Sequence, residues 1–128
     1  PGAEELLSAL HGRYTLCLAS NGTGWVQEGR LKNSGILPLL DQVFISEYLG
    51  ANKPQLGFFD ACFASLPGVK RSESLMLGDS LTSDMLGGKI AGMHTCWYNP
   101  NRLPLPTDGT VEYQIHRLPD LLPLLEKL

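Results

Sequence analysis

The sequence has 128 residues, which is enough for one domain that buries a hydrophobic core without disulfide bonds. A net charge of -3 argues against a nucleic-acid polymer or a membrane surface as the partner. No apolar run is long enough to span a bilayer. The three cysteines lie far apart in apolar runs, and an odd number of buried-looking thiols indicates a reducing compartment, so we expect a cytoplasmic protein.

Short apolar runs alternate with segments of helical periodicity, which predicts an α/β fold with a parallel sheet. A helix over Ala3–His11 comes first, followed by a buried strand over Tyr14–Ala19 that ends in the polar turn 20–24. A second helix is expected from about Trp25 to Asn33. The next strand covers Gln42–Ser46.

A third helix should begin at Pro54, because the missing N–H of proline costs nothing at the first helical position. The apolar face of this helix would consist of Leu56, Phe59, Phe63 and Leu66. A strand over Ser74–Leu77 then precedes a helix over Ser83–Ala91 that Gly92 caps, and another strand follows at His94–Tyr98.

The rest of the chain begins with a proline-rich surface loop over residues 99–110. A short last strand is expected at Glu112–Ile115. The C-terminal helix begins near Pro119, but Pro123 is unfavourable inside a helix, so the helix either starts around Leu122 or kinks. With no internal repeat or linker, the chain is predicted to be one domain over residues 1–128.

Three polar turns follow the predicted strands. Ser20 and Asn21 follow the first strand, Lys53 follows the second, and Asp79 follows the third. Ligands of open parallel sheets bind beyond the carboxyl ends of the strands, so we expect these turns on one rim of the sheet. A hydroxyl, a lysine and a carboxylate can hold phosphate oxygens and Mg²⁺, which predicts a site for phosphoryl transfer to or from a small phosphate compound.

Several segments together resemble the motifs of the haloacid dehalogenase superfamily. Leu18–Gly22 is similar to the second motif, and Lys53-Pro54 followed by Phe58–Asp60 is similar to the third. Gly78–Asp84, with its two aspartates, resembles the fourth motif. Pro1–Leu7 resembles the segment in which these proteins re-enter the core domain after the cap. The order of these motifs over nearly the whole chain makes the resemblance specific.

The resemblance implies a Rossmann-like, three-layer α/β/α core and a magnesium-dependent phosphatase of the helical-cap branch, nearest to the pyrimidine 5'-nucleotidase (YjjG-like) group. Its substrate would be a small phosphate monoester such as a nucleoside monophosphate. Asp79 would bind Mg²⁺, and Asp84 would support the water shell of the metal or orient Lys53. Ser20, Asn21 and Lys53 would bind the phosphoryl group, and Ser20, Lys53 and Asp79 would form the catalytic set.

One departure concerns the first motif, DxDx[TV], whose first aspartate forms the aspartyl-phosphate intermediate. No DxD occurs in the sequence. We expect the chain to be the C-terminal part of a core domain that lacks the central strand and the cap. A missing strand would keep Tyr14–Ala19 and Ser74–Leu77 from pairing, and the chain alone should have negligible phosphatase activity. The alternative is a catalytically inactive binding or regulatory protein.

A remote alternative is a serine esterase, because Gly78–Leu81 spells the GDSL signature with Ser80 as the nucleophile. That family also needs a DxxH motif, whereas His116 follows Tyr113 and His94 follows Ala91 at this spacing. A serine without a base is a weak nucleophile, so the esterase has little support.

Overall fold

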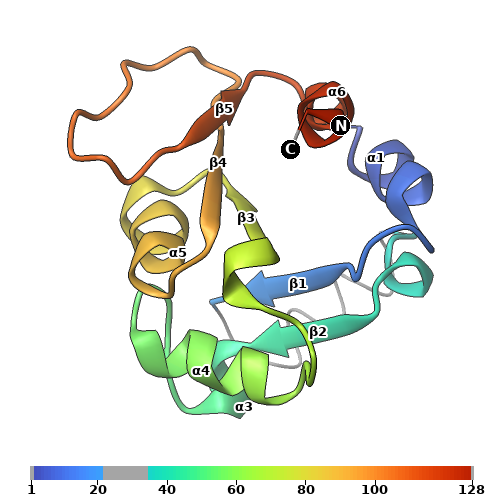
Figure 1. Cartoon of the computed structure of the whole chain (residues 1–128), viewed down its shortest axis with the longest axis vertical. Coiled ribbons are helices and arrows are strands. Elements are labelled where there is room, and N and C mark those ends of the chain that lie inside the picture. The colour runs from blue at the N-terminus through green and yellow to red at the C-terminus, as the bar shows by residue number, and fades with distance from the viewer. Residues whose placement is uncertain (1, 22–34, 128) are drawn as a thin grey trace. The chain divides into compact units, whose positions relative to one another are not determined.

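The computed structural model describes residues 2–21 and 35–127. The helix predicted over residues 25–33 lies outside these residues. The chain divides into two compact units, one formed by Pro1–Gly50 with Leu118–Leu128 and the other by Ala51–Arg117. The described strands form one parallel sheet in each unit, with the orders β1-β2 and β3-β4-β5 (Figure 1). The prediction of parallel strands is therefore confirmed.

The first unit contains two strands and three helices in its described part. Its elements are α1 (Ala3–Leu10), β1 (Cys17–Ser20), β2 (Gln42–Ile45), α3 (Ser46–Leu49) and α6 (Leu121–Glu126), with 3-10 turns at Leu37–Leu39 and Leu118–Asp120. Leu6 and Leu10 of α1 and Leu121 of α6 are buried. Gly2 lies against Pro119, so the two ends of the chain meet in this unit.

The first strand is shorter than predicted. It begins at Cys17 rather than at Tyr14, because the backbone N–H groups of Arg13 and Tyr14 both bond to the carbonyl of Leu10 and form a tight turn. The expectation of a fully buried strand is also wrong in part, since Cys17 is exposed and the rest of β1 is half-buried.

The second unit holds the larger sheet. Its elements are α4 (Leu56–Ala64), a 3-10 turn (Arg71–Glu73), β3 (Leu75–Gly78), a π-helical turn (Leu81–Met85), α5 (Leu86–Ile90), β4 (His94–Tyr98) and β5 (Tyr113–Ile115). Strand β3 pairs with β4, and β1 pairs with β2, so the described residues contain no direct β1–β3 pairing.

Two glycines allow α5 to pack closely on its neighbours. A Cβ at Gly88 would lie 2.9 Å from the Cβ of Met76 on β3 and 3.0 Å from the Cγ2 of Thr95 on β4. A Cβ at Gly87 would lie 2.7 Å from the ring of Phe59 on α4. Since protein interiors are closely packed, these contacts explain why small residues occupy this face of α5.

The helix predicted from Pro54 begins two residues later, at Leu56. The N–H of Gln55 bonds to the carbonyl of Asn52, and the side-chain oxygen of Gln55 accepts from the N–H of Asn52, so residues 52–55 form a separate turn. The predicted apolar face is corrected as well. Its buried residues are Phe58, Phe59 and Cys62, whereas Leu56 is exposed.

The C-terminal helix begins at Leu121, between the two starting points that the sequence suggests. Pro123 is its third residue. The N–H groups of the first helical turn have no partner inside the helix, so proline is tolerated there without a break. The burial of Leu121 anchors the helix within its unit.

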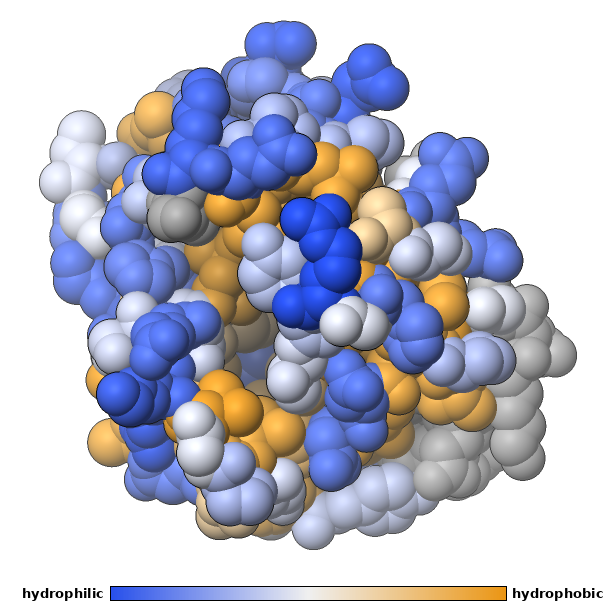
Figure 2. Space-filling view, turned by 45° about the vertical axis from the view of Figure 1, so that its right-hand side comes forward, coloured by the Kyte–Doolittle hydropathy of each residue, from blue (hydrophilic) through white to orange (hydrophobic). Residues whose placement is uncertain are grey.

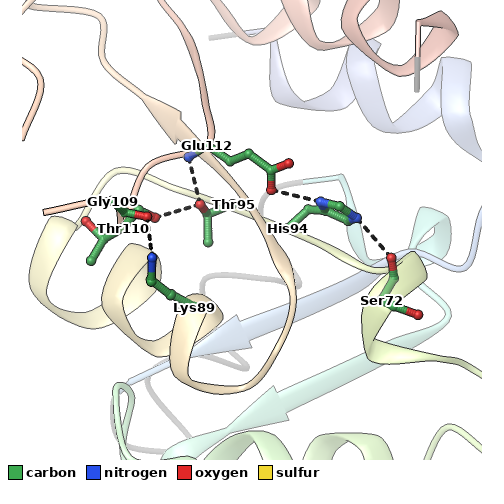
Figure 3. Close-up of polar contacts among 7 residues, drawn as sticks. All are labelled: Ser72, Lys89, His94, Thr95, Gly109, Thr110 and Glu112. Carbon is green, nitrogen blue, oxygen red and sulfur yellow. Dashed lines mark hydrogen bonds and ion pairs between the residues drawn. The ribbon is translucent and has the colours of Figure 1, made fainter. Parts of the chain in front are cut away.

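The chain segment that enters β5 is fastened by side chains of α5 and β4 (Figure 3). Lys89 donates to the carbonyl of Gly109 at 2.8 Å. The hydroxyl of Thr95 donates to the carbonyl of Thr110 at 2.6 Å and accepts from the N–H of Glu112 at 3.0 Å. Residues 109–112, which follow the proline-rich loop, are therefore held by hydrogen bonds from α5 and β4.

Hydrophobic residues also reach the surface, where they lie among hydrophilic ones on the face drawn in Figure 2. The exposed ones include Tyr14, Tyr48, Ile90, Leu103 and Leu105. Within residues 2–21 and 35–127, no helix combines the length and the apolar character that a membrane span requires.

Candidate functional site

The acidic turn after β3 is tightly structured. The carbonyl of Ser80 accepts from the N–H groups of both Asp84 and Met85, which produces a π-helical turn where the sequence predicts regular α-helix. The hydroxyl of Ser80 accepts from the N–H of Ser83 at 3.1 Å and caps the turn. Such π-turns occur frequently at functional sites, and this one brings Asp84 back beneath the end of the strand.

Lys53 and Asp84 form an ion pair in the second unit. The Nζ of Lys53 lies 2.5 Å from the Oδ1 of Asp84, and the side chains are only 9% and 8% exposed. The Oδ2 of Asp84 accepts from the N–H of Ser80 at 3.3 Å. One carboxylate therefore connects the lysine of the turn before α4 to the backbone of the acidic turn.

Gly78 is the last residue of β3, and its missing side chain makes room for Asp84. A Cβ on Gly78 would approach the Cβ of Asp84 to 2.6 Å and its carboxylate more closely still. Real Cβ atoms do not come so near to other heavy atoms. The glycine is therefore required for the buried position of Asp84.

Asp79 follows Gly78 and is exposed, unlike Asp84. Among the described residues its carboxylate has no hydrogen bond or ion pair, whereas its backbone carbonyl accepts from the indole Nε1 of Trp97 at 3.1 Å. An exposed carboxylate at a strand end suits Mg²⁺, which takes one or two carboxylates and keeps several waters. Within residues 2–21 and 35–127, no group of three or more histidine, cysteine, aspartate or glutamate side chains is placed to hold a metal ion.

Ser20 and Asn21 belong to the first unit, at the end of β1. Ser20 is half-buried, and its hydroxyl donates to the carbonyl of Asn21 at 3.5 Å. Lys53, Asp79 and Asp84 all belong to the second unit. The structure thus brings the lysine and the two aspartates into one local arrangement, while the shared site with Ser20 and Asn21 stays a prediction.

Ser80 lacks the partners of an esterase nucleophile. Its hydroxyl is hydrogen-bonded to the N–H of Ser83. The three histidines bond elsewhere in the described chain: His11 to Leu39, His94 to Glu112 and Ser72, and His116 to Asn99. A serine nucleophile needs an adjacent base, so the geometry gives the esterase alternative no support.

The family of haloacid dehalogenase-like hydrolases matches residues 1–98, which is most of the chain. The chain belongs to this family. Among curated proteins, it is similar to the pyrimidine 5'-nucleotidase PynA of Streptococcus pneumoniae, with 42% identity over 98% of this chain and 54% of the relative. It is also similar to the pyrimidine 5'-nucleotidase YjjG of Escherichia coli, with 35% identity over 99% of this chain and 56% of the relative. It spans about half the length of these relatives.

Solved structures of haloacid dehalogenase-like hydrolases have the same fold. The structure of the hydrolase YfnB from Bacillus subtilis bound to magnesium gives a TM-score of 0.94 at 36% identity, over 97% of this chain and 54% of that one. A 2-haloacid dehalogenase from Pseudomonas syringae gives a TM-score of 0.87 at 27% identity, over 99% of this chain and 53% of that one. The predicted Rossmann-like α/β class and the resemblance to the nucleotidase group are both confirmed.

Two residues of the site are missed by reasoning from the sequence. From the sequence, Trp97 is interpreted as a packing residue. Nothing in the sequence of a strand shows that its indole N–H reaches the turn after β3, the neighbouring strand. Gly78 reads as part of a motif, but its steric role depends on the return of Asp84. Its signal in the sequence is the position of a glycine directly before an acidic turn.

Proposed function

We propose that the chain is the phosphate- and magnesium-binding part of a phosphohydrolase that acts on small phosphate monoesters. Lys53 would bind phosphate oxygens through its ammonium group, and Asp79 would bind Mg²⁺. Ser20 and Asn21 would hold the phosphoryl group from the end of β1. The bound Mg²⁺ would neutralise negative charge on the phosphate, as metal ions do in phosphoryl transfer.

The observation that carries this proposal is the bridge formed by Asp84. Its two oxygens contact Lys53 and the N–H of Ser80, so it fixes a cation beside the turn that bears the exposed Asp79. A buried ion pair costs desolvation energy and is weak evidence for stability, which favours a role in positioning charge. The arrangement places a lysine where an anion can be held and leaves a second carboxylate open to a cation.

More specifically, we propose that the substrate of the whole protein is a pyrimidine nucleoside monophosphate. It is supported by the similarity to two pyrimidine 5'-nucleotidases, while a glyceraldehyde 3-phosphate phosphatase of Pyrococcus furiosus with 30% identity indicates how widely substrates vary among relatives. We therefore propose that the substrate is a phosphate ester, which is the feature common to the substrates of these relatives. A pyrimidine base on that ester is the narrower part of the proposal.

The proposal can be tested by titrating the 128-residue chain with orthophosphate, with and without Mg²⁺, while NMR follows the amides of residues 78–85. We expect shifts that need both ions and disappear in Asp79→Asn, which removes a metal ligand at an exposed position. Asp108→Asn is a matched control, because Asp108 is also an exposed aspartate but bonds to Thr110.

No shift with both ions, or equal shifts in Asp79→Asn, would refute the proposed site. In the whole protein, uridine 5'-monophosphate should bind more tightly than ribose 5-phosphate if the pyrimidine assignment is correct, and equal binding would remove that assignment alone. The 128-residue chain should hydrolyse p-nitrophenyl phosphate negligibly, because its sequence has no DxD motif. Substantial magnesium-dependent turnover would contradict this expectation, and binding without turnover is also what an inactive phosphate-binding protein would show.

A further inference from the structure

The peptide unit that joins Asp79 to Ser80 is held at both of its polar groups. Its carbonyl, which belongs to Asp79, accepts from the Nε1 of Trp97 at 3.1 Å. Its N–H, which belongs to Ser80, donates to the Oδ2 of Asp84 at 3.3 Å. Because a peptide unit is planar, these two hydrogen bonds together fix its rotation about the chain axis.

Trp97 is well placed to hold this peptide. It lies on β4 directly opposite Gly78, the last residue of β3, and is only 2% exposed. A buried indole N–H requires an acceptor, and the carbonyl of Asp79 supplies it. Packing fixes the indole ring, so its N–H gives the acidic turn a rigid point of attachment from the neighbouring strand.

The direction of the Asp79 side chain depends on this backbone. Its carboxylate is exposed and has no hydrogen-bond or ion-pair partner in the described part of the chain. No described side chain holds it in place, so the backbone at Asp79 sets the region that the rotamers of this carboxylate can reach. Loss of the Trp97 hydrogen bond would allow the flanking peptide to rotate and would widen that region.

We propose that Trp97 is a positioning residue for Asp79, and that its indole N–H orients the carboxylate toward the metal. This inference rests on the proposed function, because it assigns Trp97 a role in a magnesium site. Trp97 does not touch the metal and acts only through the backbone of the acidic turn. The net contribution of one hydrogen bond is roughly 0.5–1.5 kcal/mol, so its loss should weaken Mg²⁺ binding by about 2- to 10-fold.

A simple packing role for Trp97 makes a different prediction from a positioning role. Trp97→Phe removes both the N–H and part of the buried ring, so it cannot separate the two. Replacement of Trp97 by β-(3-benzothienyl)alanine keeps the bicyclic shape and puts sulfur in place of the N–H. Replacement by 4-fluorotryptophan, introduced in the same way, keeps the N–H and serves as the matched control.

The experiment titrates Mg²⁺, with orthophosphate present throughout, into the full chain and its two replacements while NMR follows the amides of residues 78–85. Amide hydrogen exchange is measured on the same samples without metal. We expect the benzothienyl protein to bind Mg²⁺ about 2- to 10-fold more weakly and to exchange faster at Asp84 and Met85, with β4 and β5 unchanged. The fluorotryptophan protein should behave like the native chain.

Equal Mg²⁺ affinity in the benzothienyl and native proteins would overturn the positioning role and leave the proposed function intact. Faster exchange throughout β4 and β5 would assign Trp97 a packing role only and would also overturn it. Absence of Mg²⁺ binding by the native chain would refute the proposed function, and the role of Trp97 with it. The affinity of the native chain therefore distinguishes the two failures.

Discussion

The side chain of Asp84 lies in the space that a side chain on Gly78 would occupy. A Cβ at Gly78 would come within 2.6 Å of the Cβ of Asp84. The contact lets Asp84 sit 5% exposed beneath the end of β3 while it bonds to Lys53 and Ser80. The glycine of the acidic motif is thus explained by the carboxylate six positions further along the chain.

The first prediction concerns Gly78→Ala. The added methyl group would displace Asp84 and weaken its bonds to Lys53 and Ser80, and overpacking of this kind costs about 1–3 kcal/mol. Urea unfolding should show a loss of that size. Gly57→Ala is the control, because among the described residues a Cβ there would meet Ala51 alone, at 3.8 Å, and alanine is favoured over glycine in a helix by about 0.5–1 kcal/mol. A Gly78→Ala protein as stable as the native chain would contradict the steric argument.

The second prediction concerns the ion pair of Lys53 and Asp84. Asp84→Asn removes the carboxylate that pairs with Lys53, whose side chain is only 9% exposed, and breaking a buried pair in this way costs about 3–5 kcal/mol. The double variant Lys53→Met, Asp84→Asn should lose less stability than Asp84→Asn, because it also removes the buried positive charge of Lys53. Urea unfolding of the single and double variants measures the coupling. Additive losses would show that the two side chains do not interact.

The sequence allows most strands and the parallel topology to be predicted, because short apolar runs between polar turns have few other interpretations. Strand His94–Tyr98 agrees with its predicted bounds. The starts of elements are predicted less well. The strand expected at Tyr14 begins at Cys17, and the helix expected at Pro54 begins at Leu56, since hydrogen bonds in preceding turns compete with regular structure.

The charged members of the candidate site are named from the sequence, but their contacts are not. Asp84 is assigned two possible tasks, and its contact with Lys53 depends on a π-helical turn that no periodicity indicates. The same holds for Trp97, whose bond to Asp79 spans two strands. Such contacts arise when elements that are distant in the sequence pack together. A single sequence does not indicate which of these elements come into contact.

The third prediction concerns pH. His94 donates from one ring nitrogen to the carboxylate of Glu112 at 2.8 Å and from the other to the carbonyl of Ser72 at 2.9 Å, as Figure 3 shows. Both partners accept, so the doubly protonated ring satisfies both bonds. The hydrogen bond to Glu112 is the main cause that raises the pKa of His94 above its ordinary 6.5. Partial desolvation lowers this pKa, whereas the charge of Glu112 and the hydrogen bond to Ser72 also raise it.

Because the folded pKa is raised, the stabilisation from His94 is fully present below pH 6.5 and is lost as the pH rises through the folded value. Urea midpoints measured across this range should fall less with pH in His94→Gln than in the native chain. His116→Gln is the matched control, since His116 bonds through one ring nitrogen to the carbonyl of Asn99. An identical pH dependence in His94→Gln and the native chain would exclude this contribution.

The last prediction concerns Thr95, which is 3% exposed and uses one hydroxyl for two bonds. The hydroxyl donates to the carbonyl of Thr110 and accepts from the N–H of Glu112, where the chain enters β5. Thr95→Val keeps the shape but leaves the carbonyl of Thr110 and the N–H of Glu112 without this partner. The bond to Thr110 is buried, and an unsatisfied buried group costs about 1–3 kcal/mol.

We expect Thr95→Val to lower the free energy of unfolding by about that amount and to speed amide exchange at Glu112 and along β5. Thr95→Ser should retain most of the stability, because it keeps the hydroxyl and removes only a methyl group. Urea unfolding and hydrogen exchange measure the two effects. If Thr95→Ser proves less stable than Thr95→Val, the methyl contacts near Gly88 outweigh the hydrogen bonds, and α5 packing rather than the hydroxyl holds this part of the sheet together.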